Sequence, residues 1–159
     1  MFRCVPIFLA LSLMPACGGQ RDASKGPPAD AGKTPRATLM AYHYHRDRGQ
    51  YTKARALVAK SSLGLVPAKD GKGMSERAQR LRGFAIDHEK VAEKQATVYF
   101  RTWFSLATKA RGGRPTVAKL VNEDGRWKLD LKATMQLTAA VKKGRDKFGF
   151  YDGSKKWWK

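Results

Sequence analysis

The chain has 159 residues and carries 32 Lys and Arg against 13 Asp and Glu, a formal net charge of +19 at pH 7. This length suits one small globular domain, and the sequence contains neither an internal repeat nor a second core. Its two cysteines, Cys4 and Cys17, are too few for a disulfide framework. The basic excess directs attention to anionic partners such as lipid headgroups or polymers.

Residues 1–16 have the pattern of an export signal. A basic residue precedes an apolar run from Val5 to Met14, and the small residue Ala16 comes directly before Cys17. The apolar run is shorter than the roughly 20 residues that span a bilayer, so an export signal is favoured over a transmembrane helix. The segment Leu13 to Cys17 resembles the lipobox of bacterial lipoproteins. An ordinary secretory signal followed by a coincidental cysteine is the alternative.

The lipobox resemblance implies that Cys17 is lipidated in the mature protein. Removal of residues 1–16 takes away Arg3 and Cys4, which leaves 31 Lys and Arg against 13 Asp and Glu, a net charge of +18. Lipidation would account for the single mature cysteine of an exported protein. Gly18 stands where an aspartate often marks retention in the inner membrane, so the outer membrane is favoured.

Residues 17–33 follow as the lipidated cysteine and a predicted linker. The segment from Gly18 to Lys33 is built from Gly, Pro, Ala and charged residues and has no large apolar side chain. Such a composition predicts disorder, because there is too little apolar surface to bury. A flexible tether of this length would reach roughly 20–25 Å from the membrane.

Three helices are expected at the start of the domain, which we assign to residues 34–143. Thr34 suits the N-cap of the first helix and Pro35 its first turn, and Gly49 can end it. Apolar side chains at helical spacing mark one face of this helix, namely Ala37, Met40, Ala41 and Tyr44. A second helix carries Tyr51, Ala54 and Val58. A loop is expected over 64–73 and a short third helix over 75–82.

The spacing of the apolar residues then changes from the helical spacing to the alternation that is typical of strands. A strand begins at Phe84, and the strongest one runs from Gln95 to Leu106 with aromatic residues on both faces. Segments 116–121 and 126–131 predict a hairpin around Asn122 to Gly125, because Asp-Gly between alternating strands is a strong turn signal. Helices followed by antiparallel strands predict an α+β fold.

A resemblance to a known superfamily covers roughly residues 34–131. It rests on the Thr-Pro helix start, the run Arg48 to Ala54 that opens the second helix, and the closing hairpin Val121 to Leu129. The chain is similar to nuclear transport factor 2-like (cystatin-like) proteins, in particular to their small bacterial lipoproteins. The resemblance implies a curved antiparallel sheet wrapped on the N-terminal helices as a cone, and it leaves a homodimer open. Such a cone would have a pocket lined by Met40, Tyr44, Phe100, Trp103 and Trp127.

The sequence offers no catalytic constellation, and fold alone does not supply one. His43 and His45 point about 200° apart on a helix, and no ligand spacing typical of zinc is present, so neither a metal nor another cofactor is expected. Asp47, Asp87 and Glu89 lie among charged neighbours, whereas an isomerase-type acid or base, with Tyr44 as the candidate hydroxyl, needs an apolar pocket. We therefore expect no enzyme, with a cryptic or degenerate isomerase or dehydratase as the alternative.

The basic charge is concentrated towards the C-terminus, where residues 144–159 read as a basic aromatic tail. Trp, Tyr and Lys together favour a membrane–water interface. The candidate contacts to anionic lipid or polyanion are Lys142, Lys143, Arg145, Lys155, Lys156, Trp157 and Trp158. In the alternative, Phe148 to Tyr151 fold back on the sheet and only the end is free. Nucleic acid is not expected as a physiological partner, because the protein is exported. The sequence thus predicts a lipid-anchored binding or scaffolding protein of the cell envelope, which uses either the pocket or the basic surface.

Overall fold

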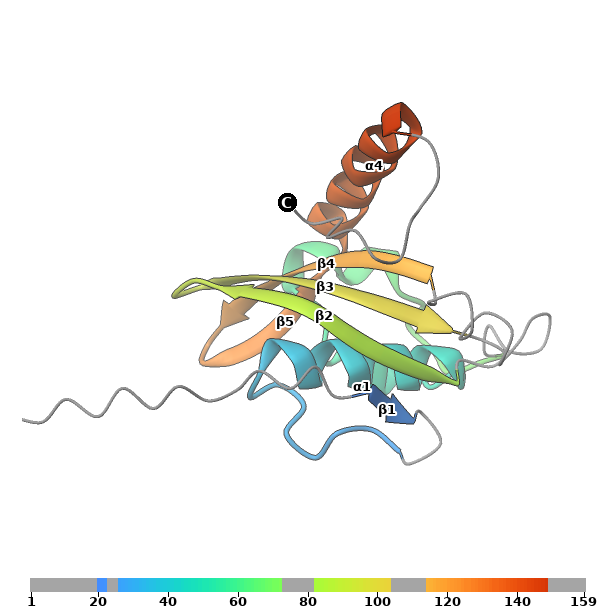
Figure 1. Ribbon diagram of the computed structural model, residues 1–159. Coiled ribbons are helices and arrows are strands. Elements are labelled where there is room, and N and C mark those ends of the chain that lie inside the picture. The colour runs from blue at the N-terminus through green and yellow to red at the C-terminus, as the bar shows by residue number, and fades with distance from the viewer. Residues whose placement is uncertain (1–19, 23–25, 73–81, 104–113, 149–159) are drawn as a thin grey trace, which may run out of the picture.

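The described residues form helices packed on an antiparallel sheet. The computed structural model describes residues 20–22, 26–72, 82–103 and 114–148 (Figure 1). Neighbouring strands all run antiparallel, in the order β1-β2-β3-β4-β5. In chain order, the elements are β1 (Gln20–Asp22), α1 (Pro35–Asp47), α2 (Tyr51–Arg55), the 3₁₀ helix η2 (Lys60–Leu65), β2 (Gly83–Val91), β3 (Gln95–Trp103), β4 (Arg114–Glu123), β5 (Arg126–Asp130) and α4 (Leu131–Phe148).

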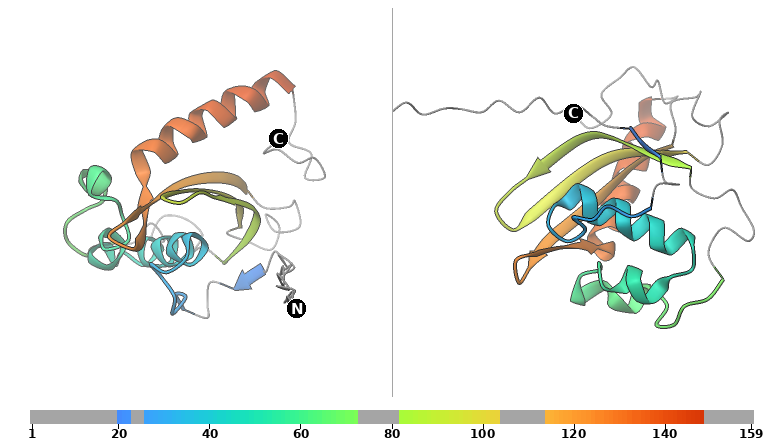
Figure 2. Two further views of the ribbon diagram at one scale, coloured as in Figure 1. Left: turned by 90° about the vertical axis from the view of Figure 1, so that its left-hand side faces the viewer. Right: turned by 90° about the horizontal axis from the view of Figure 1, so that it is seen from below.

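Helix α1 begins and ends as the sequence predicts. The Thr34 hydroxyl accepts a hydrogen bond from the Ala37 N–H at 3.2 Å, and Pro35 occupies the first turn. The C-cap is Arg48, and Gly49 follows with φ of 70°, a conformation that glycine adopts without strain. The helix lies along one face of the sheet (Figures 1 and 2). Leu39, which no predicted stripe included, is fully buried there.

The second helix is shorter than its predicted apolar stripe. Helix α2 ends at Arg55, and Val58 is buried instead through a parallel β-bridge to Leu129. Backbone bonds from Leu129 N–H to Leu57 O and from Ala59 N–H to Leu129 O extend the sheet beyond β5. Helix η2 then covers the beginning of the predicted 64–73 loop. Of the predicted third helix, residues 75–81 lie outside the described part, and Arg82 is not helical.

Strands β2 to β5 form a meander, and the predicted hairpin is confirmed. Asp124 and Gly125 have φ of 54° and 76°, the left-handed pair that a two-residue turn between twisted strands requires. Strand β3 is described as far as Trp103, and residues 104–106 of the prediction lie outside the described part. The α+β class is confirmed. The sheet is not strongly curled around the helices (Figure 2).

One hydrophobic cluster fills the space between α1 and the sheet. Phe84, Phe100 and Leu120 lie in it at 2% exposure or less, and Leu129 closes it from β5. Side chains alternate across the sheet, so Arg101 and Trp103 of β3 lie on the face opposite to Phe100. Strand β2 has an irregular register between Ile86 and His88, where Asp87 stands as an extra residue in a bulge.

The prediction of a disordered linker is wrong for the described residues of 17–33. Gln20 to Asp22 form β1, which pairs with Gly83 to Ala85 at the edge of β2. Further on, Gly32 N–H donates to the Thr38 hydroxyl at 2.9 Å and Gly32 O accepts from Trp127 N–H at 2.8 Å. Composition failed here because these attachments use backbone groups, which every residue carries whatever its side chain.

The sequence interpretation contained no counterpart of α4. This helix starts directly after β5, because the Asp130 carboxylate accepts from the Ala133 N–H at 3.0 Å and acts as its N-cap. The same carboxylate accepts from the Ser62 hydroxyl at 3.0 Å, which ties the helix start to η2. Helix α4 runs to Phe148, past residue 144 where the tail was expected to begin. It rises on the side of the sheet opposite to α1 (Figures 1 and 2).

Candidate functional site

The five predicted pocket residues do not all face one another. Met40, Phe100 and Trp127 belong to the core cluster between α1 and the sheet. Tyr44 is partly buried, and the Arg48 guanidinium carbon stacks 3.7 Å from the centre of its ring. Trp103 is buried on the other face of the sheet, where it stands opposite Gly83. The structure therefore brings three of the five together, as parts of the packed core.

The ring of His43 borders this core. The ring makes edge contacts with Phe84 and Phe100, at centroid distances of 5.2 and 5.5 Å. Burial of the ring, reinforced by the positive charge of Arg46, lowers the pKa of His43 to about 3. The imidazole is thus neutral at physiological pH and packs as an aromatic group. His45 is separate, since its Nδ1 lies 2.7 Å from Gln50 Oε1.

This burial predicts that His43 makes folding stability pH-dependent. The unfolded chain takes up a proton near pH 6.5, whereas the folded chain takes it up only near pH 3. Between these values the unfolded state binds more protons, so the free energy of unfolding falls as the pH falls, by about 2 kcal/mol from pH 7 to pH 5. Urea denaturation at several pH values measures it, with His43→Leu as the control. Identical pH profiles for the two proteins would contradict the burial.

The carboxylates considered for catalysis are each paired with an arginine. The Asp87 carboxylate accepts hydrogen bonds from Arg101 Nε at 2.8 Å and from Arg101 Nη2 at 2.5 Å. The Asp87 side chain is only 6% exposed. Glu89 lies 3.7 Å from Arg36 of α1. Asp47, at the end of α1, is buried at 7% exposure with Arg48 at 3.8 Å. Asp87 bonds to Arg101 on one face of the sheet and Glu89 pairs with α1 on the other, so these groups do not form one site.

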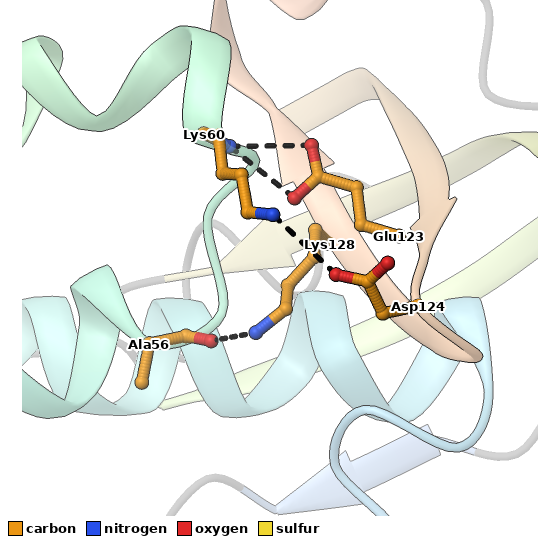
Figure 3. A network of polar contacts seen from close by, with 5 residues as sticks. All are labelled: Ala56, Lys60, Glu123, Asp124 and Lys128. Atoms are coloured by element: carbon orange, nitrogen blue, oxygen red, sulfur yellow. Dashed lines mark hydrogen bonds and ion pairs between the residues drawn. The ribbon is translucent and has the colours of Figure 1, made fainter.

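A network of polar contacts joins η2 to the β4–β5 hairpin (Figure 3). The Lys60 backbone N–H donates to Glu123 Oε1 at 3.2 Å, and Lys60 Nζ lies 3.4 Å from Asp124 Oδ2. Lys128 Nζ donates to the Ala56 carbonyl oxygen beside them. The Lys60 and Asp124 side chains are 79% and 85% exposed, so water and salt screen their attraction.

The same region is hollowed into an open polar depression of about 600 Å³. It lies where the β2–β3 turn meets the β4–β5 turn, since both turns of a meander fall at one end of the sheet. The Asn122 N–H donates to Lys94 O at 2.9 Å across this junction. The depression is lined by Lys60, Glu93, Lys94, Asn122, Glu123, Asp124 and Gly125. The depression presents exposed hydrogen-bonding groups of both charges, which suits weak polar contacts with a partner.

The sequence interpretation missed this depression, although it identified one of the two turns. An antiparallel meander places alternate turns at the same end, which would have brought Glu93 and Lys94 to the Asn122–Gly125 turn. No sequence signal placed Lys60 there, because its position depends on the bridge between Val58 and Leu129.

The predicted basic contacts lie on or beyond α4. Lys142, Lys143 and Arg145 fall on this helix, in a part where the structure describes the backbone only. Met135, nearer the helix start, is 63% exposed and so leaves an apolar group in solvent. The predicted lipidation site and the terminal contacts lie outside the described residues, namely Cys17, Lys155, Lys156, Trp157 and Trp158.

Within the described ranges, no group of three or more His, Cys, Asp or Glu residues is arranged to hold a metal ion. The helices of that same part include none with the length and apolarity to cross a membrane. No protein family, curated protein or solved structure matches the chain.

Proposed function

We propose that this protein is a lipoprotein of the bacterial cell envelope, anchored through Cys17, whose domain binds an anionic membrane surface without catalysis. The observation that carries the proposal is α4. This helix extends away from the sheet (Figure 1), and it combines basic residues with the exposed Met135. Its charged residues are Lys132, Lys142, Lys143, Arg145 and Lys147, against Asp146.

The physical basis is the attraction of clustered cations to anionic headgroups. A basic residue close to such a surface contributes about 1 kcal/mol, and amphipathic basic helices lie in the interface with apolar side chains inserted. A lipid anchor would keep the domain, with its net charge of +18 in the mature chain, at that surface. The anchor and the helix then reinforce each other, because the first supplies a high local concentration for the second.

The alternative use of the domain is a small apolar ligand in the conical pocket of a nuclear transport factor 2-like fold. That assignment rests on the sequence resemblance. Met40, Phe100 and Trp127 already pack in the core, so a ligand there would have to displace core contacts. Binding of a membrane surface through α4 needs no such rearrangement and is therefore the function we favour. We assign the anchor to the outer membrane because Gly18 follows Cys17.

Lipidation is tested by labelling cells that express the full chain with palmitate. Incorporation is expected in the wild type and its loss in Cys17→Ser, with the precursor retaining residues 1–16. Unlabelled wild-type protein, or normal processing of the variant, would show that the protein is secreted by an ordinary signal. Pro15→Ala, a change in the same segment that keeps Cys17, serves as a variant with unchanged or improved labelling.

The role of α4 is tested on an unlipidated chain of residues 18–159 with phosphatidylglycerol vesicles. Replacement of Lys142, Lys143 and Arg145 by Glu is expected to weaken sedimentation with these vesicles at least tenfold, since reversing even one such contact exceeds 1.4 kcal/mol. A matched control changes three exposed lysines outside α4, namely Lys33, Lys53 and Lys69, to Glu.

Equal losses in the two triple variants would show that net charge, and not α4, drives binding. Wild-type binding that does not differ between phosphatidylglycerol and phosphatidylcholine vesicles would contradict the proposal itself. Deletion of residues 153–159 measures the separate contribution of the aromatic end.

A further inference from the structure

The pairing of β1 with β2 shortens the tether between the proposed anchor and the domain. Gln20, Arg21 and Asp22 stand opposite Ala85, Phe84 and Gly83 in an antiparallel ladder. Cys17 precedes Gln20 by three residues, and an extended chain spans about 3.5 Å per residue, so the anchor lies within about 10 Å of the sheet. The 20–25 Å tether expected from composition does not apply once β1 is docked.

A tether this short also determines which side of the domain meets the membrane. Strand β1 lies at the edge of β2 (Figure 1), and the segments 57–59 and η2 lie beyond β5 at the other edge of the sheet. Strands are about 4.8 Å apart, so β2 and β5 are separated by about 14 Å. With the anchor beside β1, the edge of β2 is the near side and η2 is the far side.

The edge of β2 beyond β1 carries groups that suit a headgroup region. Strand β1 covers Gly83 to Ala85, and in the described ranges the ladder between β1 and β2 ends at Ala85. The side chains here include Lys90, which is exposed, and Val91, which is 58% exposed. An ammonium group next to an apolar one matches the boundary between phosphates and acyl chains.

The geometry points to a fixed orientation in which the edge of β2, with Lys90 and Val91, lies against the bilayer and η2 faces the aqueous phase. This inference rests on the proposed lipid anchor at Cys17. It goes beyond that proposal by adding the edge of β2 as a second contact with lipid, besides that of α4. It also gives β1 a role, which is to convert a flexible attachment into an oriented one.

The orientation is tested by imposing the anchor chemically on the mature chain, residues 17–159. Its one thiol, Cys17, is coupled to maleimide-bearing phosphatidylethanolamine in phosphatidylcholine vesicles, so the outcome does not depend on cellular lipidation. A genetically encoded fluorescent amino acid replaces either Lys90 at the near edge or Lys60 on η2, two exposed lysines. Lipids with a spin-labelled headgroup quench probes that lie near the surface.

Quenching at position 90 is expected to exceed that at position 60 by at least twofold. Insertion of a fifteen-residue Gly-Ser segment between residues 19 and 20 is expected to reduce this ratio towards one, since the tether would no longer restrict the domain. Equal quenching at the two positions without the insertion, or stronger quenching at position 60, would overturn the orientation. Absence of palmitate labelling in cells would refute lipidation of Cys17, whereas the orientation measured with the chemically coupled chain would still hold.

Discussion

Phe100→Ala is expected to lower the free energy of unfolding by about 3–5 kcal/mol, the largest effect of any single change considered for this protein. Phe100 is 1% exposed in the core cluster, and its ring centroid lies 5.8 Å from that of Phe84. Truncation removes buried apolar surface and leaves a cavity, while small domains are stable by only about 5–15 kcal/mol. Urea denaturation should show a lower midpoint with an unchanged slope.

Met135→Ala is the matched control for Phe100→Ala. Met135 is 63% exposed on α4, so its truncation should change stability by less than about 0.5 kcal/mol. A similarly small loss for Phe100→Ala would mean that its side chain borders open space, as the pocket hypothesis requires. The experiment therefore also decides between a packed core and a ligand pocket at this position.

Gly83→Ala is expected to cost about 2–3 kcal/mol, although it adds a single methyl group. Gly83 stands opposite Trp103 in the β2–β3 ladder. A Cβ atom at this position would lie 2.6 Å from Trp103 Cε2 and 2.8 Å from Nε1, well inside van der Waals contact. The rigid indole and the paired backbone both resist displacement, so the sheet must distort. Thermal or urea denaturation measures the loss.

Gly71→Ala provides the comparison, because a Cβ there meets nothing within 4 Å. It should leave stability within about 0.5 kcal/mol of the wild type. Trp103→Leu in the Gly83→Ala background should recover part of the loss, since the smaller side chain makes room for the methyl group. Additive losses in the double variant would show that the two residues do not touch.

Local chemistry predicted the features of this fold that depend on adjacent residues. Thr34 and Pro35 define the start of α1 through a cap that spans three residues, and Asp124-Gly125 defines the last hairpin through its own backbone angles. The alternation of side chains also predicted a strand with aromatic residues on both faces, and β3 has Phe100 on one face and Trp103 on the other. Each of these signals is complete within a short stretch of sequence, so the sequence alone is sufficient to recognise it.

The features that sequence reasoning missed depend on residues far apart in the chain. In the sequence, Asp130 is one of the polar residues that alternate with apolar ones along β5. Its second role, as the N-cap of α4, involves a hydrogen bond from the distant Ser62. The pairing of Gln20 with Ala85 uses backbone groups of residues far apart in the chain. Candidate pocket residues were chosen by type from several elements, and the alternation that places Trp103 opposite to Phe100 was not carried into that choice.

Helix α4 follows β5 directly, so the helix is rigidly coupled to the rest of the domain. No loop separates Asp130 from Leu131, and the Thr134 hydroxyl accepts from the Lys119 N–H at 2.9 Å just after the helix begins. The Ser62 hydroxyl also accepts from the Lys132 N–H at 3.2 Å. A force applied to the distal end of α4 would therefore pass through this rigid joint into β4 and η2, the elements that border the polar depression. A contact that displaces the helix would therefore also displace η2 at the far edge of the sheet.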